Sequence, residues 1–196
     1  MMTPFICMEI ISELEELVQV FAREVKSKYT LETLKDVPIL RAYRDFFWRV
    51  GIDPTKIRPA AEALIRRILA GKPVPRINTL VDAYNLASIK TSIALAAFDQ
   101  TKLRGKLLMR PAEPGEAFLG IGMDSAMQLR GGEVVITDNE KLIAVYPYRD
   151  AETSKVTETT SDLILMMCGC PGIEEASLIQ AGQVAAELVL KFCGGR

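Results

Sequence analysis

The segment Arg76-Ile77-Asn78-Thr79-Leu80-Val81-Asp82-Ala83-Tyr84-Asn85 has the pattern of the opening turns of a helix with two opposed faces. Apolar side chains recur at i, i+3, i+4 and i+7, the spacing of a buried helical stripe: Leu80, Ala83, Tyr84 and Ala87. Polar side chains form a second stripe: Asn78, Asp82, Asn85 and Ser92. Asn and Asp are poor residues for a helix interior because their side chains compete for backbone hydrogen bonds. The polar stripe is therefore either a capped, solvated face or a ligand-binding face.

The length and composition are typical of one globular domain. With 196 residues, of which 49% are hydrophobic, the chain can bury a sizeable core. We expect a single domain over 1–196, with its core in 37–196. No apolar run approaches the roughly 18–20 residues of a bilayer span, and the first residues lack the features of a secretory signal. These absences predict a cytoplasmic protein with no membrane partner.

The sequence contains no histidine, which excludes Ser-His-Asp triads, Cys-His dyads and imidazole metal ligands. Catalysis would have to use carboxylates, hydroxyls, lysine, thiols, backbone dipoles or the substrate itself. The four cysteines are Cys7, Cys168, Cys170 and Cys193. One Cys-X-Cys pair with two distant thiols is a weak zinc pattern, so we expect reduced thiols, no metal and no cofactor.

The charges are unevenly distributed along the chain, although the net charge is only −1. Residues 41–76 contain nine Lys or Arg against three acidic residues, a net of +6, and residues 133–175 contain nine acidic against three basic residues, a net of −6. Such asymmetry permits a basic face that meets phosphates. Two complementary faces that contact each other would give the same pattern.

The first half of the chain is expected to be mainly helical. A first strand is predicted near Phe5–Ile11, followed by a helix through Leu14, Leu17, Val18 and Phe21. An amphipathic helix over Leu40–Val50 should end at Gly51. The next helix has Pro59 in its first turn, a buried stripe of Ala61, Leu64, Ile65 and Ile68, and a stop at Gly71.

The second half changes to the pattern of strands and turns. Short apolar runs separated by Gly, Pro, Asp and Asn predict strands at 106–109, 117–121, 133–137 and 141–146, with a hairpin turn at 137–140. The continuous apolar run Leu163–Met167 is suited to a central strand, and a closing helix follows. Gly120-X-Gly122 and Gly131-Gly132 are interpreted as turns. The fold class is therefore α+β, with a mixed or antiparallel sheet flanked by helices.

The segment 146–161 concentrates polar chemistry between the hairpin and the last strand. It contains two tyrosines, Arg149, Asp150, Lys155 and six hydroxyl side chains of Ser and Thr. Arg149 could hold a carboxylate or phosphate in a bidentate fork. The alternative is an exposed polar connection made of turn-forming residues.

Three motifs together resemble the B3/B4 domain of the phenylalanyl-tRNA synthetase beta subunit, the domain that hydrolyses tRNA mischarged with tyrosine. They are Ile77–Asn85, then Leu95-Ala96-Ala97-Phe98-Asp99 with Lys102-Leu103-Arg104-Gly105, and Val135-Ile136-Thr137-Asp138 with Ser154-Lys155-Val156-Thr157-Glu158-Thr159-Thr160. The whole chain resembles free-standing proteins built around this domain still more closely, from about Arg41 to its end. The resemblance implies a B3/B4-like fold.

The resemblance also shows where the chain departs from the editing site. In the synthetase domain a threonine, a histidine and a glutamate surround the mischarged tyrosine, and the matching positions here are Tyr84, Ala96 and Met166. Asn85 is the one pocket residue retained. The pocket has thus lost an imidazole that positions water and a carboxylate that binds the phenol.

Two functions from different classes follow from these observations. The first is a hydrolase that removes amino acids from mischarged aminoacyl-tRNA in trans, and the alternative is a non-catalytic module for RNA, an amino acid or a small carboxylate. The candidate ligand-binding residues are Asn78, Asp82, Tyr84, Asn85, Arg149, Asp150 and Lys155. The candidate contacts to RNA phosphates are Arg41, Arg44, Arg66 and Arg67.

Overall fold

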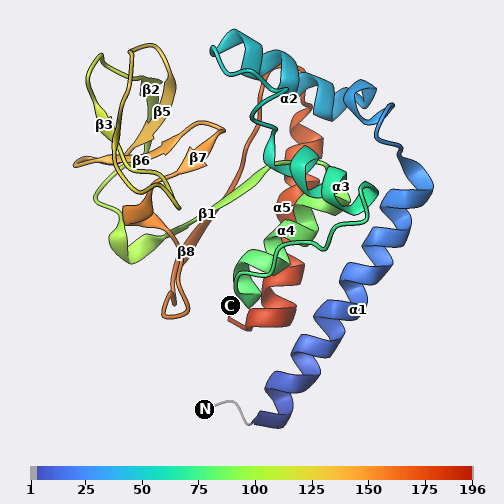
Figure 1. The fold of residues 1–196 in the computed structure, drawn as a ribbon. Coiled ribbons are helices and arrows are strands. Elements are labelled where there is room, and N and C mark those ends of the chain that lie inside the picture. Colours follow the sequence, from blue (N-terminus) through green and yellow to red (C-terminus); the bar gives the residue numbers. More distant parts are fainter. Residues whose placement is uncertain (1–3, 196) are drawn as a thin grey trace.

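The computed structural model describes the backbone of residues 4–195 and the side chains of residues 12–195. Helices gather on one side of the molecule and short strands on the other (Figure 1). Five α-helices occur within this described range: α1 (Pro4–Lys28), α2 (Pro38–Arg49), α3 (Ala60–Leu69), α4 (Thr79–Thr91) and α5 (Glu175–Cys193). Short 3-10 turns at Leu34–Asp36, Gln100–Lys102 and Glu152–Ser154 connect other elements.

Helix α4, which the 76–85 segment begins, is the centre of the helical side. It packs against α1, α3 and α5. Its buried residues include Val81, Asp82, Leu86 and Ser88 as well as Ala83 and Ala87, whereas Leu80 and Tyr84 are only partly buried. The expectation of two opposed faces is therefore wrong, because three neighbouring helices cover α4 from different sides. The helix ends at Ser92, whose φ of 62° is left-handed and stops the hydrogen-bond ladder.

The strands form three antiparallel groups. A four-stranded sheet has the order β2 (Leu108–Pro111), β5 (Val134–Thr137), β6 (Leu142–Val145) and β7 (Arg149–Asp150). Strand β1 (Leu95–Asp99) pairs with β8 (Leu163–Met167), and β3 (Ala117–Phe118) pairs with β4 (Met127–Gln128). The α+β class and the antiparallel sheet are confirmed, and the β1–β8 ribbon links the strand side to the helices (Figure 1).

Two predicted strands differ from the structure. The backbone over Phe5–Ile11 is the beginning of α1, not a strand, because extending an existing helix adds one hydrogen bond per residue without a new nucleation cost. Leu163–Met167 forms a strand, but it pairs only with β1 and is not central. The inner position belongs to β1, which also bridges Lys155 through Phe98. The side chains before residue 12, including Cys7, lie outside the described residues.

The aspartates of the family-like motifs brace the scaffold. Asp99 accepts hydrogen bonds from the Thr101 N–H (3.0 Å) and the Thr160 hydroxyl (2.9 Å), so it joins the end of β1 to the 155–160 segment. Asp138 accepts three backbone N–H bonds, from Arg104, Glu140 and Lys141, and closes the β5–β6 hairpin. No helix in the described residues is both long enough and apolar enough to cross a membrane.

Candidate functional site

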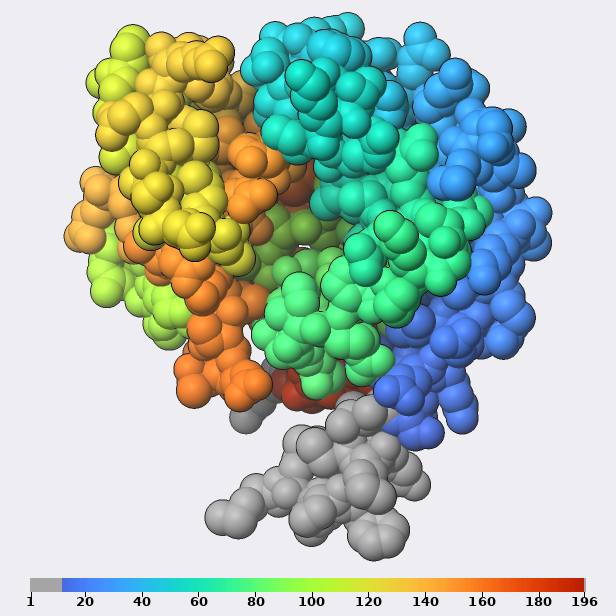
Figure 2. Space-filling model, in the orientation of Figure 1, coloured from blue at the N-terminus to red at the C-terminus, as the bar shows by residue number. Residues whose placement is uncertain are grey.

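A cavity of about 140 Å³ lies where the strand side meets the helices. The space-filling view is hollowed at this place, between the segment that carries β7 and the segment that begins α3 (Figure 2). One wall is the start of β1 with Ala94–Ala96, a second is the turn from β6 to β7 over 144–150, and Met166, Cys168 and Ala60 complete the lining. Ala96 and Met166 are also direct partners in the β1–β8 ladder. Most of these lining residues have apolar side chains, although polar atoms contribute nearly as much of the lining surface as apolar atoms.

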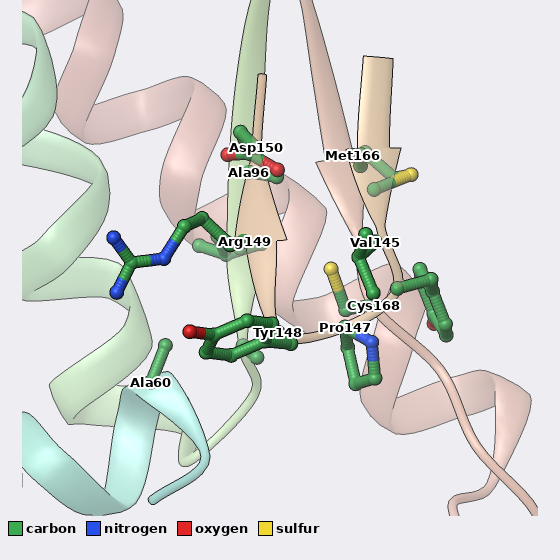
Figure 3. A pocket seen from close by; sticks show the side chains of 13 residues that line it. Ala60, Ala96, Val145, Pro147, Tyr148, Arg149, Asp150, Met166 and Cys168 are labelled. Carbon is green, nitrogen blue, oxygen red and sulfur yellow. The ribbon is translucent and has the colours of Figure 1, made fainter. Parts of the chain in front are cut away.

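Two charged side chains of β7, Arg149 and Asp150, line this cavity (Figure 3). The strand is held between β6, which it pairs through Ala144 and Val145, and the 119–121 segment. On that second side the Ile121 N–H donates to the Asp150 carbonyl at 2.9 Å. The loop predicted to carry function thus contains a short strand that fixes both charges.

Contacts with the 120–121 backbone hold the Arg149 side chain in place. Its Nη1 donates to the Ile121 carbonyl at 2.9 Å, and its guanidinium carbon lies 5.1 Å from the centre of the Tyr148 ring. Gly120 leaves the space for this path, because a Cβ there would lie 2.3 Å from Arg149 Cδ. The sequence pattern marks Gly120 only as a turn residue, and its role beside Arg149 has no local sequence signal. The remaining guanidinium donors are available to a ligand.

Asp150 is partly buried and has no hydrogen-bond or ion-pair partner for its carboxyl group among the described residues. Burial raises the pKa of Asp150 to about 7. Burial also raises the pKa of Tyr84, and the nearby carboxyl of Asp150 raises it further. The Cys168 thiol on the opposite wall has its pKa raised by the same two causes in the same order. Tyr84 and Cys168 therefore remain neutral near pH 7, and Asp150 is the group that titrates there.

Two tyrosine hydroxyls fix the backbone after β8, at one end of the cavity. The Tyr43 hydroxyl of α2 donates to the Cys168 carbonyl and accepts from the Ala94 N–H at 3.0 Å. The Tyr146 hydroxyl donates to the Gly169 carbonyl. A cis peptide bond joins Tyr146 to Pro147. Helix α2 and the turn that follows β6 thus hold the same short segment.

Asn78 and Asp82 are occupied by contacts within the protein. The Asn78 side chain accepts the Val81 N–H at 2.9 Å and caps α4. Asp82 is buried and accepts from Arg76 Nε at 2.7 Å and from the Ile77 N–H at 2.9 Å. Neither residue lines the cavity.

Tyr84, Asn85 and Lys155 have different environments. Tyr84 packs against apolar residues of β8 and is close enough to Asp150 for their charges to interact. Asn85 is partly buried, lies outside the cavity lining, and makes no side-chain hydrogen bond within the described range. The Lys155 ammonium pairs with Glu152. The structure therefore brings Arg149 and Asp150 together with Ala96 and Met166, but not with Asn78, Asp82, Asn85 or Lys155.

The four arginines proposed for phosphate contact fall into two pairs. Arg44 and Arg66 both bind the fully buried carboxylate of Glu62, at 2.9 Å each. Arg41 is 60% exposed, with ion pairs of 3.8 Å to Asp36 and 3.5 Å to Asp45. Arg67 is exposed and donates to the Pro73 carbonyl. Arg41 and Arg67 are the two that remain accessible.

Ala60, Tyr148 and Cys168 are lining residues that sequence reasoning missed. Ala60 begins α3 and is remote in sequence from the other lining residues, so only the fold brings it to the cavity. Across the described residues there is no cluster of three or more His, Cys, Asp or Glu that could hold a metal ion. The cysteines at 168, 170 and 193 are free thiols.

Together, the antiparallel ribbon, the small sheet and the cavity between them define a class of α+β domain, and comparison with known proteins identifies the family. Residues 42–194 match the B3/4 domain family, to which the chain belongs. The chain is 35% identical over 128 residues to a phenylalanine–tRNA ligase beta subunit of Thermotoga maritima, covering 65% of this chain and 16% of that protein.

Other beta subunits of phenylalanine–tRNA ligase give similar matches. Identity is 33% over 115 residues to the protein of Nocardia farcinica (59% of this chain, 13% of the relative) and 32% over 165 residues to that of Symbiobacterium thermophilum (71% and 18%). The chain therefore spans less than a fifth of the length of these relatives. The resemblance inferred from the three motifs is confirmed.

Proposed function

We propose that this protein acts on the aminoacyl end of tRNA in trans and hydrolyses the ester of a mischarged amino acid. The observation that carries the proposal is the position of the cavity. Its lining contains Ala96 and Met166, two of the four positions that the resemblance matches to editing residues of the synthetase domain, together with a charged residue, Arg149, whose guanidinium has further donors besides the one bound to Ile121. This lining supports the proposal that the cavity corresponds to the editing pocket of the synthetase domain, with different side chains around it.

Arg149 is suited to the developing charge of ester hydrolysis. A water oxygen attacks the carbonyl carbon, the bond from that carbon to the ribose oxygen breaks, and the ribose oxygen takes a proton. Guanidinium donors that face the carbonyl oxygen stabilise its negative charge in the transition state. The side chain is already held by the Ile121 carbonyl and the Tyr148 ring, so little reorientation is needed.

The attacking water needs a proton acceptor, and the chain supplies no imidazole. The neighbouring hydroxyl of the terminal ribose can position this water and relay its proton. Asn85, the retained family residue, would support the RNA end from outside the cavity rather than act within it. The reaction would take place in the cytoplasm, where aminoacyl-tRNA is used.

The alternative is a binding module without catalysis. The apolar side chains of Ala96 and Met166 in the cavity favour it, because neither can transfer a proton. In that case the same cavity would hold an amino acid or a small carboxylate.

Purified protein incubated with each aminoacyl-tRNA in turn separates the two functions. We expect accelerated release of the amino acid from at least one aminoacyl-tRNA, and a loss of roughly 100-fold in rate for Arg149→Ala, as for removal of one oxyanion donor. Arg130→Ala is the matched control, because Arg130 is exposed and has no ion pair in the described structure. Deacylation at the uncatalysed rate for every substrate would reject hydrolysis and leave the binding module.

A further inference from the structure

We propose that the cavity selects aminoacyl groups that carry a free α-ammonium and a small side chain, and that the ammonium pairs with the Asp150 carboxylate. This inference rests on the proposed function and names its substrate class. The carboxyl group has no ion-pair partner in the described part of the protein, and it lines the same small cavity as Arg149.

Comparison with the four buried carboxylates shows how unusual the partly buried Asp150 is. Each of the four has partners within hydrogen-bonding distance: Glu62 binds two arginines, Asp82 binds Arg76 and a backbone N–H, Asp99 binds Thr101 and Thr160, and Asp138 accepts three N–H groups. A buried charge without a partner is costly. Among the described residues, each of these buried carboxylates thus has partners within the protein, whereas the partly buried Asp150, which lines the cavity, has none.

Arg149 does not neutralise its neighbour. The two residues form no ion pair, since the Arg149 guanidinium reaches the Ile121 carbonyl and lies over Tyr148. An amino acid esterified to RNA has the complementary arrangement, with a cationic ammonium and a polar carbonyl one atom apart. Its ammonium would supply the charge that Asp150 lacks, and its carbonyl would face Arg149.

The volume limits the side chain. An apolar cavity of about 150 Å³ binds a molecule of benzene, and the cavity here measures about 140 Å³. The ammonium and carbonyl must share this space with the side chain. An aromatic side chain would therefore extend through the open side of the cavity toward solvent, whereas the side chains of glycine, alanine and serine fit inside it.

The pH dependence of binding follows from the groups that face Asp150. They are Tyr84 from α4, Cys168 after β8 and Arg149 on β7. Burial raises the pKa of both Tyr84 and Cys168, so these two groups stay neutral near pH 7. Asp150 must lose its proton, which occurs as the pH rises through a pKa of about 7. An α-ammonium loses its charge above roughly pH 8. Binding should therefore have a maximum between these values.

Binding of amides, which lack the reactive ester, tests the inference separately from catalysis. We expect L-alaninamide to bind the full chain at pH 7.5 in calorimetry or NMR titration, and L-tyrosinamide and N-acetyl-L-alaninamide to bind at least about tenfold more weakly. The substitution Asp150→Asn should weaken the binding of L-alaninamide by a similar factor. Asp124→Asn, an identical change at an exposed site, should leave it unchanged.

The outcomes are distinguishable from those of the deacylation assay. Binding of alaninamide without hydrolysis of any aminoacyl-tRNA would retain this inference and reject the proposed hydrolase. Equal binding of the N-acetylated and free amides, or undiminished binding by Asp150→Asn in folded protein, would overturn the pairing with ammonium. Preference for tyrosinamide over alaninamide would overturn the size limit.

Discussion

The carboxyl group of Asp150 makes the stability of the folded protein depend on pH. Burial raises the pKa of this group to about 7, well above the roughly 3.9 of an unfolded aspartate. The folded state therefore binds the proton more tightly, and the associated stability is complete below about pH 4 and is lost as the pH rises through 7.

Asp150→Asn should remove this pH dependence. One pKa unit corresponds to about 1.4 kcal/mol, so the variant should exceed the wild type in unfolding free energy at pH 8 by no more than roughly 4 kcal/mol. The difference should shrink toward pH 4. Urea unfolding at pH 4 to 8 measures it, with Asp124→Asn as the control. A variant that is less stable than the wild type at pH 8 would contradict the environment described for Asp150.

At the scale of single residues, the sequence identified polar side chains that could bind a ligand. It did not predict which of them are already occupied by contacts within the protein. Arg149 and Asp150 were recognised from their loop and line the cavity. Asn78 and Asp82 were candidates for the same reason, yet the structure uses them to cap α4 and to bind Arg76. Their partners lie within six residues in the sequence. The capping role of Asn78 could therefore have been predicted from its position just before the helix. The lack of a partner at Asp150 depends on all surrounding elements and has no local signal.

At the scale of elements, Glu62 joins two helices through one buried charge. Its carboxylate is inaccessible to solvent and binds Arg44 of α2 and Arg66 of α3. Both arginines retain some solvent access, with 16% and 25% of their side chains exposed. This contact sets the position of α2 relative to α3, whose first residue lines the cavity.

Glu62→Gln should destabilise the protein by roughly 3 kcal/mol, because removing one member of a buried ionic group leaves the others without compensation. Glu158→Gln makes the same change at an exposed site and should have little effect. Chemical denaturation of the two variants gives the comparison. A loss below about 1 kcal/mol for Glu62→Gln would mean that the arginines reach water as readily as they reach Glu62.

The elements that were predicted correctly have a clear period or a clear stop signal. The helices that end at Gly51 and Gly71 have both, and both glycines have the expected positive φ. Strand β1, with the sequence Leu95-Ala96-Ala97-Phe98-Asp99, was missed because it is buried on both faces and has neither alternation nor β-branched residues. The beginning of α1 was misjudged because isoleucines favour strands when considered alone.

At the scale of the whole molecule, the two oppositely charged segments do not neutralise each other. No ion pair in the described structure joins 41–76 to 133–175; the basic residues instead pair with Asp36, Asp45, Glu62, Glu15 and Asp82. The explanation by two contacting faces thus has no ionic contact to support it. Exposed basic side chains such as Arg41 and Arg67 remain as candidates for phosphate contacts.

Binding of tRNA should weaken with salt, and Arg41→Glu with Arg67→Glu should weaken it further. The same double change should reduce the dependence of log K on log salt by about one for each phosphate that the protein no longer neutralises. Arg23→Glu with Lys26→Glu is the matched control, since it reverses two exposed charges on α1. Filter binding or fluorescence titration at several salt concentrations gives the slopes. Equal slopes for both double variants would exclude a specific role for Arg41 and Arg67.

The Tyr43 hydroxyl gives α2 mechanical control over the width of the β1–β8 ribbon. In an antiparallel pair, two opposed residues exchange both backbone hydrogen bonds. The Cys168 N–H donates directly to the Ala94 carbonyl at 2.9 Å. The reverse bond, from the Ala94 N–H to the Cys168 carbonyl, is replaced by two bonds through the Tyr43 hydroxyl, which lies between them as a wedge. The ribbon is thereby held open at the end where both residues line the cavity. A displacement of α2 would withdraw or tilt this wedge, so a force applied to the outer surface of the helix would be transmitted to the cavity as a change of shape.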